Sequence, residues 1–216
     1  MVWETERMMV QPRAAGWIEV ICGPMFSGKT EELIRRLRRA EIAQQKVQIF
    51  KPSTDDRYSK SDVVSHDAQR IGARPVACSG DILALLEEGT AVVGVDEAQF
   101  FDAEIVQVLD ELARRGVRVV VAGLDTDYRS LPFEPMPALM AAAEYVTKLM
   151  AICLRCGSPA NRTLRHASNG PRVEVGAAER YTALCRRCYA EASALGAQPR
   201  TEEWGDAIGA KRRLQA

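Results

Sequence analysis

Short apolar segments alternate with amphipathic ones along the first 150 residues of the chain. Predominantly apolar runs of strand length predict strands at 18–22, 46–50, 75–78, 91–95, 117–122 and 149–152. Between these runs, apolar residues recur at helical spacing and predict helices over 31–44, 81–88, 102–115 and 136–148. Strands that alternate with helices predict an α/β fold, in which a parallel sheet carries helices on both of its faces.

Residues that commonly end or begin elements sharpen several boundaries. We expect Lys51-Pro52 to end the second strand, Gly89 and Gly116 to end the second and third helices, and Asp102 to cap the third helix. Two helices carry a clear apolar stripe, formed by Leu33, Ile34, Leu37, Ala40 and Gln44 in the first, and by Ile105, Val106, Leu109, Leu112 and Ala113 in the third.

The first strand runs into a glycine-bounded turn with the sequence GPMFSGKT, which fits the pattern G-x-x-x-x-G-K-[ST] of a phosphate-binding loop. Glycine allows a tight turn, so that successive backbone N–H groups can point at one anion. Lys29 would reach the terminal phosphates, Thr30 would offer its hydroxyl to Mg²⁺, and the following helix would direct its positive end at the same phosphates. The loop comprises Gly23, Pro24, Met25, Phe26, Ser27, Gly28, Lys29 and Thr30.

Polar segments follow the strands at the edge where parallel strands place a ligand. The segment 53–66 is too charged for the core and is expected to be a loop; its Asp55, Asp56 and Arg57 could serve Mg²⁺ and phosphate, or could pair with each other at the surface. Ser65, His66 and Asp67 are adjacent in sequence and therefore do not form a catalytic set, so we expect a structural role for His66.

Acidic residues follow the buried run 91–95 directly. Asp96 stands where a carboxylate that orders Mg²⁺ belongs in a phosphate-loop protein, and Glu97 could take a proton from an attacking oxygen. Two aromatic residues, Tyr128 and Phe133, lie in the loop after the run 117–122, where they could stack on a base or pack in the core.

The composition indicates a soluble, cytosolic protein with a substantial core. The chain has 216 residues, 47% of them hydrophobic, and no apolar run of membrane-spanning length. Lys and Arg number 29 and so do Asp and Glu, so the net charge of zero disfavours binding to nucleic acid. The arginines Arg35, Arg36, Arg38 and Arg39 form a local cluster, for which a solvated helix face is favoured over a nucleotide or partner contact.

Four of the six cysteines form two C-x-x-C pairs, Cys153 with Cys156 and Cys185 with Cys188. Two such pairs complete a closed tetrahedral Zn²⁺ site, which is structural; two disulfides are the alternative. The long segment 157–184 between the pairs is expected to be an enlarged loop and a candidate lid. Cys22 and Cys78 have no partner motif and are expected to pack as small apolar residues.

Taken together, these motifs resemble one family, the thymidine kinases of the cytosolic and bacterial type, which join a phosphate-loop domain to a zinc-bearing lasso domain. The matching motifs are GPMFSGKT from Gly23, KPSTDDRY from Lys51, SHD from Ser65, DEAQFF from Asp96, GLD from Gly123, C-x-x-C-G from Cys153, Tyr181, and C-R-R-C from Cys185. They cover about residues 17–190. We therefore expect a nucleotide-binding domain (16–150) and a lasso domain (151–192). The lack of periodicity before residue 16 and the scarcity of apolar residues near the end predict a flexible N-terminal extension (1–15) and a flexible C-terminal tail (193–216).

The resemblance further implies transfer of phosphate from ATP, with Mg²⁺, to the 5′-hydroxyl of thymidine. Glu97 would be the general base and Lys29 would stabilise phosphoryl charge. Beyond the phosphate loop, the ATP side would include Asp55, Asp56, Arg57, Asp96, Glu97, Ala98 and Gln99. The nucleoside pocket would include Phe101, Leu124, Tyr128, Arg172, Val173, Glu174, Val175, Gly176 and Tyr181. A homotetramer and feedback inhibition by dTTP carry over as family expectations.

The chain departs from the family pattern at three positions. Ala68 and Ala177 stand where the family usually has glycine, so the path of the lasso near Ala177 can differ. Tyr128 stands where phenylalanine also occurs, so its hydroxyl can change which pyrimidine nucleosides fit. Two alternatives remain: a deoxynucleoside kinase that prefers another base, and an ATP-switched zinc module that binds nucleic acid.

Overall fold

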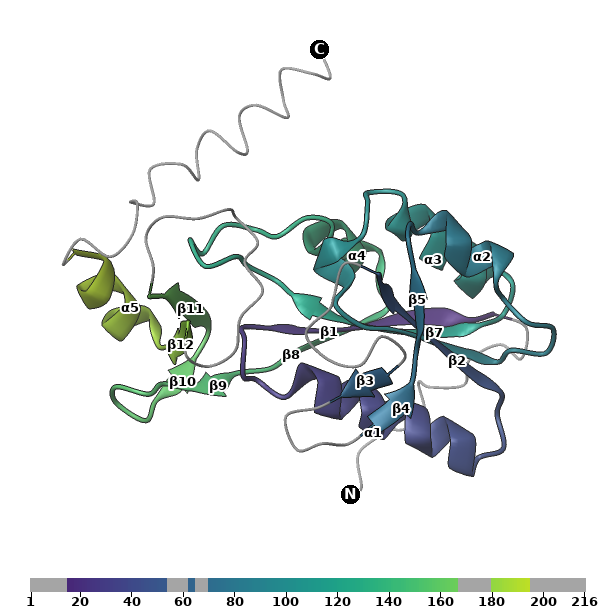
Figure 1. The fold of residues 1–216 in the computed structure, drawn as a ribbon, viewed down its shortest axis with the longest axis horizontal. Coiled ribbons are helices and arrows are strands. Elements are labelled where there is room, and N and C mark those ends of the chain that lie inside the picture. The colour runs from purple at the N-terminus through teal and green to yellow at the C-terminus, as the bar shows by residue number, and fades with distance from the viewer. Residues whose placement is uncertain (1–14, 54–61, 65–69, 167–179, 195–216) are drawn as a thin grey trace, which may run out of the picture.

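The computed structural model describes residues 15–53, 62–64, 70–166 and 180–194. Its centre is a six-stranded sheet in the order β5-β2-β6-β7-β1-β8, in which all neighbours run parallel (Figure 1). The strands are β1 (Trp17–Gly23), β2 (Val47–Pro52), β5 (Arg74–Val76), β6 (Val92–Val95), β7 (Arg118–Leu124) and β8 (Tyr145–Lys148). Among the described residues, no helix has the length and apolarity needed to cross a membrane.

Helices cover both faces of this sheet (Figure 1). Helix α1 (Lys29–Ile42) packs on one face, where Leu33, Ile34 and Leu37 join one buried cluster with residues of β1, β6 and β7. The other face packs against α2 (Gly80–Ala84), α3 (Ile105–Arg114) and α4 (Met136–Ala142) in a second cluster. The predicted α/β architecture is therefore confirmed.

The predicted helical stripes are largely confirmed. Leu33, Ile34, Leu37 and Ala40 are buried in α1, but the helix ends at Ile42, and Gln44 is exposed with a positive φ of 58°. In α3, Val108 is buried although the predicted stripe did not include it. The prediction that Asp102 caps this helix is wrong, because α3 begins at Ile105 and Glu104 occupies the N-cap position. Instead, the Asp102 carboxylate accepts hydrogen bonds from the backbone N–H groups of Ser79 and Glu104.

Several predicted boundaries shift because strands pair over longer lengths. Strand β2 ends at Pro52, as predicted, but Lys51 and Pro52 belong to the strand, are buried, and pair with β5 through the register Lys51 to Pro75. Helix α2 ends at Ala84, well before Gly89. Within the predicted loop 53–66, the structure has β3 (Asp62–Val64), which pairs antiparallel with β4 (Arg70–Gly72).

The predicted helix over 136–148 is wrong in its second half. Helix α4 ends at Ala142, and residues 145–148 form β8 at the sheet edge, parallel to β1. The β-branched pair Val146-Thr147 suits a strand, and the backbone finds its partners in β1, with Glu19 opposite Tyr145. The helical pattern predicted over 136–148 is thus overridden in residues 145–148 by pairing with a distant strand.

The chain after β8 forms a small cysteine-bearing ribbon at one end of the sheet (Figure 1). It contains β9 (Ala151–Ile152), β10 (Pro159–Ala160), β11 (Arg162–Arg165), β12 (Tyr181–Leu184) and α5 (Arg186–Ala192). Strands β9 and β10 pair antiparallel, as do β11 and β12. In the described part of the predicted enlarged loop over 157–184, residues 157–166 and 180–184, three short strands are therefore present.

Candidate active site and metal centre

The phosphate loop leaves β1 at Gly23 and enters α1 at Lys29. Gly23 (φ 147°) and Gly28 (φ 81°) both adopt backbone conformations that side chains disfavour. A Cβ at Gly23 would also lie 2.4 Å from the backbone oxygen of Leu149. Inside the loop, Ser27 Oγ and Lys29 Nζ donate to the carbonyl of Pro24 at 2.9 and 2.7 Å. The strand, loop and helix predicted around this motif are thus present.

The predicted magnesium-side residues meet at the carboxyl ends of β1 and β6. Thr30 Oγ1 lies 3.4 Å from Asp96 Oδ2, although 66 residues separate them. Asp96 is 7% exposed, and its backbone N–H donates to Phe50 in β2. Hydroxyl and carboxylate oxygens are hard ligands of the kind that Mg²⁺ prefers. This pair therefore fits the ion at the start of α1.

Glu97 follows in a left-handed backbone conformation, with φ 52°. Such a conformation is uncommon for a residue with a side chain, and it frequently marks functional sites. The turn is held in part by the Glu97 N–H, which donates to Asp96 Oδ1 at 2.9 Å. Residues 98–100 then form the short 3-10 helix η2 (Ala98–Phe100).

Gln99 lies behind the two acids and is 3% exposed. Its amide Nε2 donates a short hydrogen bond to Glu97 Oε2, and its Oε1 accepts from the Leu124 N–H at 2.9 Å. A Cβ at Gly123 would lie 2.9 Å from this Oε1. The bare backbone of β7 at Gly123 therefore leaves room for the Gln99 amide. Sequence reasoning assigned Gln99 to ATP and missed its contacts with Glu97 and Leu124.

The residues predicted to line the nucleoside pocket come from several elements. Phe101 is 8% exposed and belongs to the core cluster under α3, and Leu124 ends β7 with partial exposure. Tyr128 is 8% exposed, and its backbone oxygen accepts a 2.8 Å hydrogen bond from Tyr189 Oη of α5. Burial raises the pKa of Tyr189, which keeps this hydroxyl protonated as a donor. The loop after β7 is thus attached to the cysteine-bearing ribbon.

The ribbon contacts the sheet domain through the buried face of β11. Thr163 Oγ1 accepts a hydrogen bond from the Met25 N–H of the phosphate loop at 3.2 Å. On the same face, the Arg165 guanidinium lies 3.9 Å from the centroid of the Tyr128 ring. Sequence reasoning missed both residues. Burial alternates along β11, with Thr163 and Arg165 turned inward, but both of these residues are polar, so the sequence carries no apolar alternation that would signal the strand.

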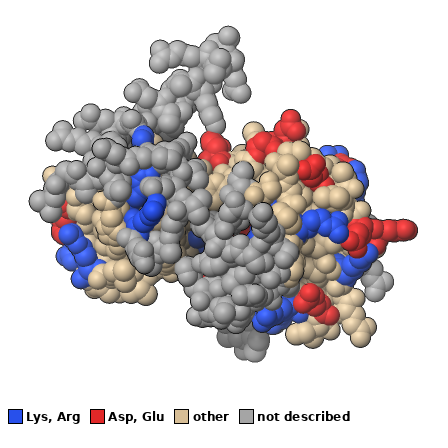
Figure 2. Space-filling view, in the orientation of Figure 1, with Lys and Arg blue, Asp and Glu red and all other residues tan. Residues whose placement is uncertain are grey.

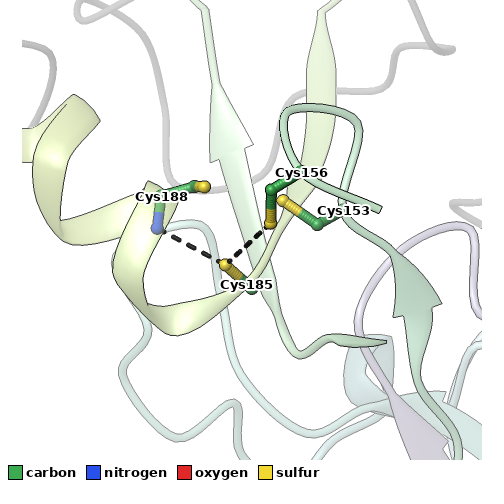
Figure 3. A group of neighbouring side chains, drawn as sticks. All are labelled: Cys153, Cys156, Cys185 and Cys188. Atoms are coloured by element: carbon green, nitrogen blue, oxygen red, sulfur yellow. Dashed lines mark hydrogen bonds between the residues drawn. The ribbon is translucent and has the colours of Figure 1, made fainter. Parts of the chain in front are cut away.

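The four cysteines of the two C-x-x-C pairs converge in the ribbon (Figure 3). Their sulfur atoms all lie within 4.8 Å of one another. Cys156 Sγ is 3.6 Å from Cys185 Sγ, which in turn accepts from the Cys188 N–H at 3.5 Å, at the start of α5. All six cysteines of the chain lie in the described regions and are free thiols, so the disulfide alternative is wrong.

The chemistry of this cluster fits a bound cation. Hydrogen bonds involving Ser158 lower the pKa of Cys156 to about 6, whereas burial raises the pKa of Cys188 to about 12. Four thiolates so close together repel one another unless a cation neutralises them. A four-sulfur set suits tetrahedral Zn²⁺ and leaves no position open for a substrate. The predicted metal-ligand set is therefore brought together by the fold.

The remaining cysteines differ from each other. Cys22 is fully buried in β1, as predicted, and burial raises the pKa of its thiol. Cys78 is exposed, so the prediction that it packs as an apolar residue is wrong. It lies between β5 and α2, where the backbone turns at the surface.

The arginine cluster of α1 is not a free basic patch. Arg35 lies 2.6 Å from Glu32, and Arg36 lies 2.8 Å both from Glu32 and from the buried Glu19 of β1. On the face drawn in Figure 2, acidic and basic side chains alternate over the sheet domain. The nucleic-acid alternative therefore gains no support from the described charges.

Several predicted residues lie outside the described regions of the chain. These are Ser65, His66 and Asp67, Asp55, Asp56 and Arg57 on the ATP side, the lasso residues Arg172, Val173, Glu174, Val175 and Gly176, and the substituted positions Ala68 and Ala177. Tyr181, by contrast, is described at the start of β12 and is 7% exposed.

Comparison with known proteins agrees with the arrangement of this site. The family model described as thymidine kinase matches residues 16–189, which include the phosphate loop, both acids and all four clustered cysteines. A curated protein named thymidine kinase, from Rhodothermus sp. (strain ITI 518), is 59% identical over 176 residues, which make up 82% of each chain. The chain belongs to the thymidine kinase family.

Proposed function

We propose that the chain transfers the γ-phosphoryl group of ATP to the 5′-hydroxyl of thymidine, giving dTMP and ADP, and that it also accepts deoxyuridine. This reaction is a salvage step that supplies DNA synthesis. The observation that carries the proposal is the convergence of the phosphate loop with Asp96 and Glu97 at one edge of the sheet. Family membership adds the nucleoside as acceptor.

On the phosphate side, the loop amides and Lys29 would stabilise the charge of the transferring group. Lys29 Nζ lies 2.7 Å from the Pro24 carbonyl and therefore over the loop that would hold the phosphates. Thr30 and Asp96 would hold Mg²⁺, which neutralises phosphate charge when ATP is bound. Positioning and electrostatics would thus supply most of the acceleration.

On the acceptor side, Glu97 would act as the general base. The 5′-oxygen forms a bond to the γ-phosphorus, the bond from that phosphorus to the bridging oxygen breaks, and ADP leaves with the electron pair. The proton of the hydroxyl passes to the Glu97 carboxylate. The position of that carboxylate, one residue beyond Asp96 and hydrogen-bonded to Gln99, supports this role.

The remaining assignments rest on the family resemblance. We assign Asp55, Asp56, Arg57, Ala98 and Gln99 to the ATP side. Phe101, Leu124, Tyr128 and Tyr181 would form the walls of the nucleoside pocket, and the backbone of residues 172–176 would bind the base edges. In this proposal residues 16–150 are the nucleotide-binding domain, and residues 151–192 are the lasso domain.

Zinc would be structural, held by the four clustered cysteines. The closed set of sulfur ligands and its distance in sequence from the acids support an anchoring role for the metal. We further propose a homotetramer that acts in the cytoplasm and is inhibited by dTTP, as the family resemblance implies.

The test is a coupled assay of ADP release with ATP, Mg²⁺ and each natural nucleoside in turn. Release that depends on thymidine, exceeds that with deoxycytidine or purine nucleosides, and disappears in Glu97→Ala is the expected result. Glu104→Ala removes an exposed acid seven positions later and should remain active. ADP release that does not depend on any nucleoside would leave only an ATPase, and a fully active Glu97→Ala would remove Glu97 from the mechanism.

A further inference from the structure

We propose that Arg165 is a positioning residue for the nucleoside pocket, which fixes the ring of Tyr128 by stacking on its face. The inference rests on the proposed function, because it assumes that Tyr128 lines that pocket. It concerns a residue of β11 that lies outside the phosphate loop, the acids and the cysteine cluster.

The side chain of Arg165 is completely buried. It is 1% exposed and is the largest fully buried side chain among the described residues. A buried guanidinium is costly unless its charge is compensated, so a position that keeps one needs a structural reason. The Tyr128 ring supplies one, since the centroid is 3.9 Å from Arg165 Cζ, well within the range of a cation–π contact.

The pairing of β11 with β12 places Arg165 beside a second tyrosine. Arg165 stands opposite Tyr181 in this antiparallel ribbon, and residues that face each other across two strands present their side chains on the same side. Arg165 therefore contacts one predicted pocket aromatic residue, Tyr128, and neighbours a second, Tyr181. These two tyrosines come from the sheet domain and from the ribbon, and Arg165 joins them.

Hydrogen bonds fix the backbone of the loop that carries Tyr128. Its backbone oxygen accepts from Tyr189 Oη at 2.8 Å. Asp127 Oδ1 accepts from the N–H groups of Arg129 and Leu131 at 2.9 and 3.0 Å, which closes the turn. With the backbone fixed, the remaining freedom of Tyr128 is mainly that of its ring. Arg129 Nε donates to the Tyr128 hydroxyl at 3.1 Å and its guanidinium lies 5.5 Å from the ring centroid, whereas Arg165 lies closer to the ring, at 3.9 Å.

The consequence concerns affinity for the nucleoside. A displaced Tyr128 ring changes the walls of the pocket, whereas the phosphate loop and Glu97 are held by hydrogen bonds of their own to Pro24, Asp96 and Gln99. Loss of Arg165 should therefore raise KM for thymidine and leave KM for ATP unchanged. A general loss of folding would instead lower the fraction of active enzyme, and with it the maximal rate, without raising KM for thymidine selectively.

The test compares Arg165→Met with Arg162→Met in the full-length protein. Arg162 lies on the same strand but on its opposite, more exposed side, so it is the matched control. We expect Arg165→Met to raise KM for thymidine about tenfold, the loss expected for a desolvated cation–π contact. KM for ATP should stay within about twofold in both variants, a bound far below that cation–π effect.

A double-mutant cycle separates positioning from a purely structural role. In a Tyr128→Leu background, Arg165→Met should raise KM for thymidine no further, because the ring on which it acts is gone. If Arg165→Met does not fold, Arg165→Lys retains the charge but not the planar group, and the same cycle with this variant gives the answer.

The outcomes distinguish this inference from the proposed function. If wild type phosphorylates thymidine but the Arg165 variants keep its KM, or raise it equally with and without Tyr128, the inference is wrong and the function stands. If wild-type ADP release does not depend on thymidine, both are overturned.

Discussion

The carboxylate of Glu97 accepts a hydrogen bond from the side-chain amide of Gln99, and the same amide accepts one from the backbone of Leu124 at the end of β7. Both ends of a buried amide are thus in use. The contact joins the proposed base to the strand that leads into the nucleoside pocket. The hydrogen bond restricts the rotamers of the Glu97 side chain and so helps to hold the proposed base in one orientation.

Replacing Gln99 by methionine should lower kcat. Methionine preserves the volume but removes the donor to Glu97, and a misplaced base loses part of the factor of about 100 or more that general base catalysis contributes. We expect kcat to fall about tenfold, with KM for ATP nearly unchanged. Steady-state kinetics measures both constants. Gln107→Met, at an exposed position of α3, is the control, and an unchanged kcat in Gln99→Met would argue against a positioning role.

Replacing Gly23 by alanine should destabilise the start of the phosphate loop. The added Cβ would lie 2.4 Å from the Leu149 oxygen, and the φ of 147° disfavours any side chain. We expect a loss of about 3 kcal/mol in the free energy of unfolding. Urea denaturation tests this, and ATP should no longer raise the melting temperature. Gly89→Ala adds a Cβ at φ 76° with open space around it, so it should cost only about 1 kcal/mol. Equal losses in the two variants would contradict the clash.

The buried carboxylate of Glu19 should make the stability dependent on acid pH. Burial alone would raise the pKa of Glu19, but hydrogen bonds from Arg118, Trp17 and Arg36 outweigh burial and hold this pKa below its ordinary value of 4.5. A hydrogen bond from Arg35 lowers the pKa of the neighbouring Glu32 to about 2. Because the folded state lowers these pKa values, their stabilisation is complete above about pH 4.5 and is lost as the pH falls toward about 2.

Glu19→Gln should therefore cost about 2–4 kcal/mol at pH 7, because two arginines lose a buried carboxylate. The difference from wild type should shrink as the pH falls below about 4.5, because the lowered pKa of Glu19 delays its protonation in the folded state. Urea denaturation as a function of pH measures it. Glu41→Gln, an exposed acid on α1, should unfold like wild type at pH 7. A difference from wild type that stays constant down to pH 2 would contradict the assignment.

Removal of one clustered cysteine should release the metal and loosen the ribbon. We expect freshly purified, reduced protein to carry about one zinc per chain and Cys185→Ser to carry none. The melting temperature should fall in that variant, since Cys185 and Cys188 begin the helix that carries Tyr189. Metal analysis and thermal denaturation measure both effects. Cys78→Ser, an exposed cysteine outside the cluster, should keep its zinc, and wild type purified without zinc would contradict the assignment.

Features of this protein that depend on local spacing along the chain could be predicted from its amino-acid sequence. Apolar runs such as 91–95 became buried strands, and the apolar stripe of α1 faces the sheet. The glycine spacing of the phosphate loop and the two C-x-x-C pairs identified both sites, because these motifs place ligand groups within one turn of backbone. Such local geometry requires no knowledge of what packs against it.

Features that depend on residues far apart in the sequence became visible in the folded chain alone. The segment 145–148 became β8 because an edge of β1 was available to pair with it, and Lys51 is buried in β2 because β5 pairs beside it. Arg165 gave no signal in the sequence, yet its guanidinium lies on Tyr128, which belongs to another part of the chain. Strand pairing and the burial of charge depend on residues that are far apart in sequence, and folding alone brings those residues together.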